Sequence, residues 1–173
     1  MPRMIVAALA LAASTLSATG DETVVIDRGL TEDRPYTLIY PTSLKPIDDG
    51  SPVTVATLQH PEAPLRCDAM IADDAPANWT AKEAANKFDR AATAVDWQAD
   101  FPGFVVTSHG MTDFQSGSAL LYRGESPDSP WGIPIAAVHA EAVDGDRIYV
   151  VECVAGKEIA AQADPLFAFV IAN

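Results

Sequence analysis

The sequence has little positive charge and few cysteines. It holds 11 Lys and Arg residues against 24 Asp and Glu residues, and its formal net charge is −13. A chain this acidic is poorly suited to nucleic acid or to an anionic membrane surface, so we expect it to bind neither. Two cysteines are too few for a dense disulfide scaffold. The chain also lacks any internal repeat or heptad array, which excludes solenoid and coiled-coil architectures.

The sequence also lacks the short motifs that mark common chemistries. It has no Gly-x-x-x-x-Gly-Lys phosphate loop, no His-Glu-x-x-His zinc motif and no Gly-x-Ser-x-Gly nucleophile turn. We interpret Ser116-Gly117-Ser118 as part of a hairpin turn. The acidic pairs Asp48-Asp49 and Asp73-Asp74 lack the spacing of a calcium loop, so we interpret them as solvated turns. The sequence therefore predicts no catalytic residue, no cofactor-binding residue, no metal ligand and no bound cofactor.

No apolar run is long enough to span a bilayer, but a shorter one lies near the N-terminus. Arg3 precedes the run Ile5–Ala13, and small residues follow as far as Gly20. A basic start, a short apolar segment and a small-residue exit are the parts of a secretory signal. We predict a signal peptide over residues 1–20, cleaved before Asp21, with Ala18 as the alternative last residue. The protein should then be periplasmic or secreted, with no stable membrane anchor.

The two cysteines are Cys67 and Cys153. An even number of cysteines in an oxidising compartment predicts a disulfide, and two buried thiols are the alternative. The spacing is not Cys-x-x-Cys, so we do not expect a redox-active pair. If both residues lie on the core side of one sheet, their Cα atoms should be about 4.4–6.8 Å apart.

Short runs of strand-forming residues, separated by Pro, Asp and Gly, follow the predicted signal peptide. The predicted strands cover residues 23–26, 36–40, 53–59, 66–72, 104–111, 118–123, 133–143 and 147–155. Thr80 and Glu83 form a capping box, and the apolar residues after it predict a helix over Ala81–Val95. The apolar spacing in residues 157–173 predicts a closing helix, in which Pro165 marks a kink or a new first turn.

Strands that are joined by tight turns must pair antiparallel. The sequence therefore predicts a single globular α+β domain over residues 21–173, with helices flanking an antiparallel sheet. Trp97, Phe101, Phe104 and Trp131 could line a ligand pocket or partner surface, and the alternative is that they close a small hydrophobic core.

The element order resembles the PsbP-type fold. The resemblance covers the stretch from Phe104 to Phe169, including residues 118–122, 135–139 and 146–151, and it also includes the helix after Thr80. That fold occurs in photosystem extrinsic subunits, in a Ran-binding import factor and in exported bacterial proteins. The resemblance implies a PsbP-like sandwich and a noncatalytic accessory or binding role. It implies no functional residue, because proteins with this fold do not share one function.

One polar cluster can be placed by strand register. If Asp144-Gly145 is a two-residue hairpin turn, His139 lies opposite Val150, and Ala137 lies opposite Glu152. Three polar residues then share a sheet face: His139, Glu141 and Glu152.

This predicted face is opposite the one that carries Cys153. The cluster could serve a periplasmic enzyme in proton transfer, or it could hold a metal. The alternative is a half-exposed polar sheet face with no chemical role.

Taken together, these patterns favour an exported, noncatalytic accessory or binding domain whose partner is an unknown protein or small molecule. The acidic composition suits a basic partner. The alternative function is a periplasmic enzyme or metal-binding protein that uses His139, Glu141 and Glu152.

Overall fold

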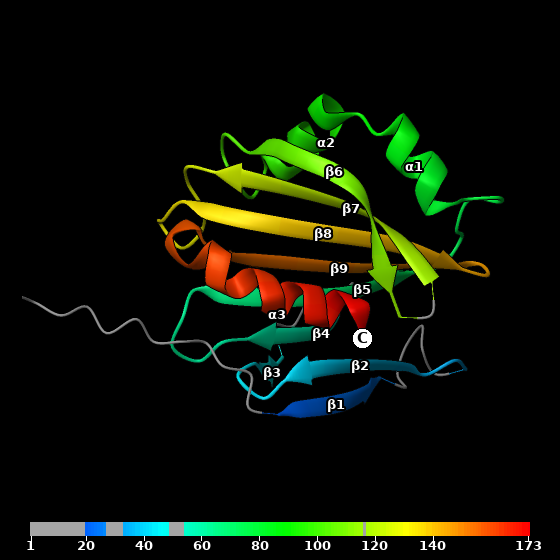
Figure 1. The fold of residues 1–173 in the computed structure, drawn as a ribbon, viewed down its shortest axis with the longest axis horizontal. Coiled ribbons are helices and arrows are strands. Elements are labelled where there is room, and N and C mark those ends of the chain that lie inside the picture. Colours follow the sequence, from blue (N-terminus) through cyan, green and yellow to red (C-terminus); the bar gives the residue numbers. More distant parts are fainter. Residues whose placement is uncertain (1–19, 27–32, 49–53, 116) are drawn as a thin grey trace, which may run out of the picture.

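The computed structural model describes residues 20–26, 33–48, 54–115 and 117–173 (Figure 1). Residues 1–19 of the predicted signal peptide lie outside the described residues, and so do Asp49 and Ser116.

A seven-stranded antiparallel sheet forms the centre of the protein, with the strand order β3-β4-β5-β9-β8-β7-β6. Its strands are β3 (Lys45–Ile47), β4 (Thr54–Gln59), β5 (Leu65–Ala72), β6 (Val105–Phe114), β7 (Gly117–Ser126), β8 (Ile135–Asp144) and β9 (Arg147–Gly156). A separate antiparallel pair consists of β1 (Asp21–Ile26) and β2 (Tyr36–Pro41). The predicted α+β class with an antiparallel sheet is confirmed. The sequence reasoning missed β3, which is short and contains Pro46.

Helices cover both faces of the sheet (Figure 1). A short 3₁₀ turn, Lys157–Ile159, leads into α3 (Ala160–Ala172), which packs with β2 against one face. The helices α1 (Ala81–Lys87) and α2 (Arg90–Trp97) pack against β6 and β7. Within the described ranges, no helix combines the length and the apolar character needed to cross a membrane.

The helix predicted over Ala81–Val95 is two helices, because the chain turns at Phe88 and Asp89. Phe88 ends α1 in an extended conformation. The Asp89 side chain accepts hydrogen bonds from the backbone N–H groups of Ala91 and Ala92, at 2.9 and 3.1 Å. An Asp side chain that satisfies free N–H groups in this way stabilises a new helix start rather than a continuous helix.

The closing helix is confirmed, and Pro165 lies inside α3 rather than at its first turn. Residues from α3 pack against β5, β8 and β9 in the larger core, with Phe167 and Val170 almost fully buried.

A second, aromatic core lies on the other face of the sheet. It contains Trp97, Phe104, Tyr122, Ile135 and Ala137. The aromatic residues Trp97 and Phe104 therefore close a core, and Trp131 is exposed.

A single glycine allows the aromatic layer to approach the sheet. A Cβ atom on Gly124 would lie 2.0 Å from Cζ of Phe104, so the Phe104 ring occupies the space that any larger residue would need. Phe104 is 1% exposed, and its ring stacks on that of Trp97, the last residue of α2, with centroids 4.7 Å apart.

The hairpin between β8 and β9 turns at Gly145-Asp146, one residue later than predicted. Asp144 pairs with Arg147, and His139 pairs with Glu152 rather than with Val150. Gly145 adopts a positive φ of 66° at the first turn position, a conformation that costs glycine little. The predicted pairing was wrong by two residues. The predicted faces are nevertheless right, because side chains alternate with a period of two.

Candidate functional site

A histidine lies between two carboxylates on the face that α1 and α2 partly cover. Nδ1 of His139 lies 2.8 Å from Oε1 of Glu152, and its Nε2 lies 3.9 Å from Oε2 of Glu141. His139 is 9% exposed, whereas the side chains of both glutamates are 30% exposed. The structure therefore brings the three predicted residues together, but it corrects the expectation of a half-exposed histidine.

This cluster is part of a row of polar residues that crosses six strands. Each member lies directly opposite the next on the neighbouring strand, and the row consists of Thr57, Asp68, Glu152, His139, Tyr122 and His109. At one end, Thr57 Oγ1 donates to Asp68 at 2.6 Å, and Nε of Arg66 donates to the same carboxylate at 2.7 Å. At the other end, Nε of Arg90 donates to Nδ1 of His109 at 3.2 Å.

Aromatic rings cover the middle of the row. The Tyr122 ring stacks on the His139 ring with centroids 4.4 Å apart. Nε1 of Trp97 donates to the Tyr122 hydroxyl oxygen at 2.7 Å. Burial raises the pKa of Tyr122, an effect that the Trp97 hydrogen bond opposes and nearby carboxylates reinforce. The Tyr122 phenol is therefore neutral at ordinary pH.

The two glutamates favour the protonated form of His139. Burial lowers the pKa of His139, but Glu141 and Glu152 together raise it by more, and the net pKa lies above the ordinary value. A charged imidazole carries a proton on each ring nitrogen. One of these protons points to Glu152, and the other nitrogen is within ion-pair distance of Glu141.

The raised pKa and the burial of His139 both work against the chemistry of the alternative function. A general base or a metal ligand needs a ring nitrogen with a free lone pair, and protonation of His139 removes that lone pair. The two carboxylates also contact different nitrogens of the ring, so they do not converge on a shared ligand position. Among the described residues, no group of three or more His, Cys, Asp or Glu side chains could hold a metal ion.

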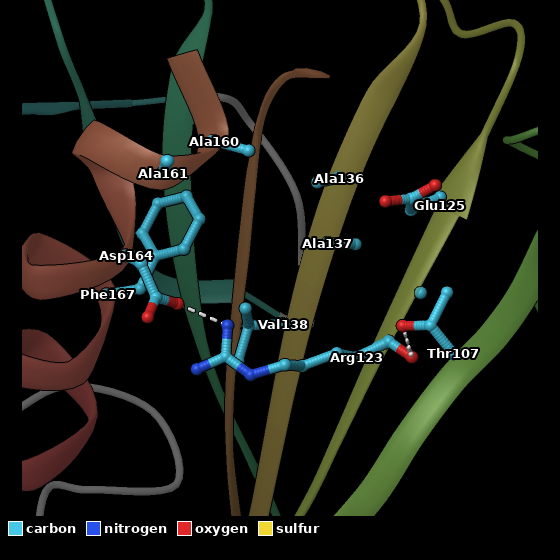
Figure 2. A pocket seen from close by; sticks show the side chains of 11 residues that line it. Thr107, Arg123, Glu125, Ala136, Ala137, Val138, Ala160, Ala161, Asp164 and Phe167 are labelled. Carbon is cyan, nitrogen blue, oxygen red and sulfur yellow. Dashed lines mark hydrogen bonds and ion pairs between the residues drawn. The ribbon is translucent and has the colours of Figure 1, made fainter. Parts of the chain in front are cut away.

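A cleft of about 390 Å³ lies on the other face, between α3 and the sheet (Figure 2). Arg123 on β7 and Asp164 on α3 form an ion pair across it. The remaining surface includes small and apolar side chains, from Ala136, Ala137, Val138, Ala160, Ala161 and Phe167. Glu125, at the rim, is paired with Lys157 at 2.5 Å. The charges around this cleft therefore neutralise each other.

The sequence reasoning missed Arg123, Asp164, Tyr122 and their contacts. The alternation along residues 118–123 indicates which residues share a face. However, the register between β7 and β8 depends on the long loop between them, which contains no two-residue turn.

The sulfur atoms of Cys67 and Cys153 lie 2.03 Å apart, at bonding distance. The two residues are direct partners on β5 and β9. Their Cα atoms are 4.0 Å apart, which is shorter than the predicted range of about 4.4–6.8 Å, so the predicted distance was wrong.

No family model matches the sequence, and no curated protein matches it. The structure is similar to that of cyanobacterial PsbP (CyanoP) from Synechocystis sp. PCC 6803, with a TM-score of 0.56 and 13% sequence identity. That match covers 92% of this chain and 94% of the other. The Ran-binding protein Mog1p of Saccharomyces cerevisiae is also similar, with a TM-score of 0.52, 11% identity and coverage of 88% and 89%.

The chain has a PsbP-like fold. The resemblance that the element order indicated is therefore confirmed. At these identities the likeness concerns the fold alone.

Proposed function

We propose that this protein is an exported, noncatalytic accessory domain that binds another protein. The observation that carries the proposal is the burial of His139 between Glu152, which lies 2.8 Å from Nδ1, and Glu141, which lies within ion-pair distance of Nε2. An imidazole that is buried in this way contributes to the fold, and the Tyr122 ring that covers it leaves a substrate little access to it.

Charge pairing around the cleft supports the same function. Arg123 is paired with Asp164, and Lys157 is paired with Glu125. These pairs leave no net charge at the cleft to attract a charged small molecule, and this favours a protein partner.

The overall charge supports a partner with a basic surface. A protein with a net charge of −13 attracts a basic protein. Salt screens this attraction, so at 0.1 M ionic strength it acts over roughly 10 Å. The Mog1p structure is that of a Ran-binding protein, so one protein with this fold has a protein as its partner.

Export is supported by two independent features of the chain. The first is the sequence of Arg3, an apolar run and small residues before Asp21. The second is the approach of the Cys67 and Cys153 sulfurs to bonding distance, since disulfides persist in oxidising compartments.

The proposal is tested on protein that is recovered from periplasmic and culture fractions of its native host. We expect an intact mass that begins at Asp21 and no stoichiometric metal. We also expect a partner protein that rebinds when purified and is released as salt concentration rises.

Two results would overturn the proposal. The first is a full-length product in the cytoplasm, which contradicts export. The second is a stoichiometric metal that is lost in the His139→Ala variant, which supports the metal-binding or enzymatic alternative.

A further inference from the structure

The two edges of the seven-stranded sheet differ in how well they are protected. One edge is β3, which has three residues and contains Lys45 and Pro46. Short length, lysine and proline all discourage another strand from pairing with an edge. The other edge is β6, which has ten residues and contains no Lys, Arg or Pro.

Much of the β6 edge is also exposed, although α1 and α2 pack against one side of the strand. Val105 is 56% exposed and Met111 is 53% exposed. Apart from its pairing with β7, no backbone hydrogen bond joins β6 to another element among the described residues. Arg90 donates to the carbonyl oxygen of Thr107 at 3.5 Å. This contact lies where the pairing register of β6 shifts, between Val106 and Ser108, and away from residues 110–113.

We propose that β6 accepts an extended segment of a partner protein, which adds a strand to the sheet. In this binding mode, backbone hydrogen bonds supply affinity and alternate side chains supply specificity. The inference rests on the proposed binding function and names the surface that performs it.

The occupant is a segment of another protein rather than a second copy of this chain. Two copies would each bring a net charge of −13 to the same edge, which opposes their association. β6 contributes one acidic residue, Asp113, and no Lys or Arg. These charges suit an extended segment that is neutral or basic.

The side chains of β6 define what the segment must present. The residues that share a face with Arg123 and Glu125 are Val105, Ser108, Gly110 and Thr112. Their small size leaves room beside the cleft, which Thr107 borders on this side (Figure 2). The segment should therefore carry apolar side chains at alternate positions, so that they lie against the small and apolar surface of that cleft.

Site-specific photo-crosslinking in the native host tests the binding edge. A benzoylphenylalanine replaces Met111 on β6 and, as the matched control, Ile47 on β3, which is also exposed. We expect the β6 probe to crosslink to one continuous segment of one partner, and the β3 probe not to. A synthetic peptide of that segment should then slow hydrogen exchange of the β6 backbone amides.

Paired charge variants separate strand addition from simple charge attraction. Met111→Lys and Met111→Glu should each weaken binding of the synthetic peptide by roughly tenfold or more, because any charge on the edge opposes pairing. Ile47→Lys and Ile47→Glu should change binding by less than about twofold, because they lie on the other edge. Circular dichroism and the unfolding midpoint verify that each variant is folded.

Three results would overturn the inference. Crosslinks from β6 to a second copy of this chain would show that the occupant of the edge is not a segment of another protein. Opposite effects of the two Met111 variants would indicate charge attraction alone. If the partner binds both Met111 variants with unchanged affinity, the interface lies elsewhere, and the proposed binding function still holds. If the protein has no protein partner at all, both the strand-addition inference and the proposed function are wrong.

Discussion

His139 and Glu152 face each other across β8 and β9, with Nδ1 of the imidazole 2.8 Å from a carboxylate oxygen. The Tyr122 ring covers the imidazole at a centroid distance of 4.4 Å, and the Trp97 ring meets it edge-on at 6.4 Å. Because His139 is enclosed by these groups, it is part of the protein's internal structure. Its contribution to stability can be measured separately from any binding.

Replacing His139 with alanine should therefore destabilise the protein. The His139→Ala variant loses the ion pairs to Glu152 and Glu141 and the ring contacts, and we expect a loss of about 2–3 kcal/mol in the free energy of unfolding. The control is His109→Ala at an exposed position in the same row, which should cost only about 0.5 kcal/mol. Urea unfolding followed by circular dichroism measures both, and equal losses would contradict the buried role.

The stabilising effect of His139 should also depend on pH. The folded-state pKa is raised, so the folded protein holds this proton more tightly than the unfolded chain, whose histidine pKa is about 6.5. The contribution is then complete below about pH 6.5 and is lost as pH rises through the folded pKa. The stability difference between wild type and His139→Gln should shrink from pH 6 to pH 9, and a difference that grows would contradict the assignment.

Local sequence patterns predicted the position of the polar cluster but not its burial. Asp144-Gly145 marked the hairpin, and the period of two put His139, Glu141 and Glu152 on one face even though the turn lies one residue later. The enclosure of His139 depends on Tyr122 and Trp97, which come from other parts of the chain. Their approach requires the register of β7 against β8 and the position of α2, and no short-range pattern specifies either.

The helix predicted over Ala81–Val95 shows a second case in which local sequence patterns were not enough. The apolar spacing in Ala81–Val95 continues through Asp89, so periodicity predicts one helix. The structure instead uses Asp89 as a cap, and the Phe88 ring packs 5.2 Å from Tyr122 and 4.8 Å from His109. An aspartate that caps and an aspartate on a solvated helix face look alike in a sequence, and tertiary packing decides between them.

The cysteine pair predicts a covalent link between β5 and β9. Peptide mapping without reductant should recover Cys67 and Cys153 in one linked fragment. The two residues are 86 positions apart, and closing a loop of this length stabilises the folded state by up to about 4.6 kcal/mol in the chain-entropy model. The Cys67→Ala/Cys153→Ala variant should lose about 2–4 kcal/mol, and free thiols in oxidised native protein would contradict the link.

The contact between Gly124 and Phe104 predicts a large effect from a single added methyl group. A Cβ at position 124 would lie 2.0 Å from the Phe104 ring, and β7 is held between β6 and β8, so its backbone has little freedom to move. Gly124→Ala should cost about 3 kcal/mol or more. Gly110→Ala, on the neighbouring strand, is the matched control, because a Cβ there meets no atom within 4 Å.

Replacing Phe104 with a smaller side chain should recover part of the stability lost in Gly124→Ala if the two residues compete for the same space. Phe104→Leu alone removes buried ring atoms and should cost about 1–2 kcal/mol, but in the Gly124→Ala background it makes room for the methyl group. The double variant should therefore be more stable than the sum of the single effects allows, with a coupling of about 1 kcal/mol or more. Additive effects in urea unfolding would mean that the Phe104 ring does not depend on the space at Gly124, and the packing of Trp97 on Phe104 would then need another explanation.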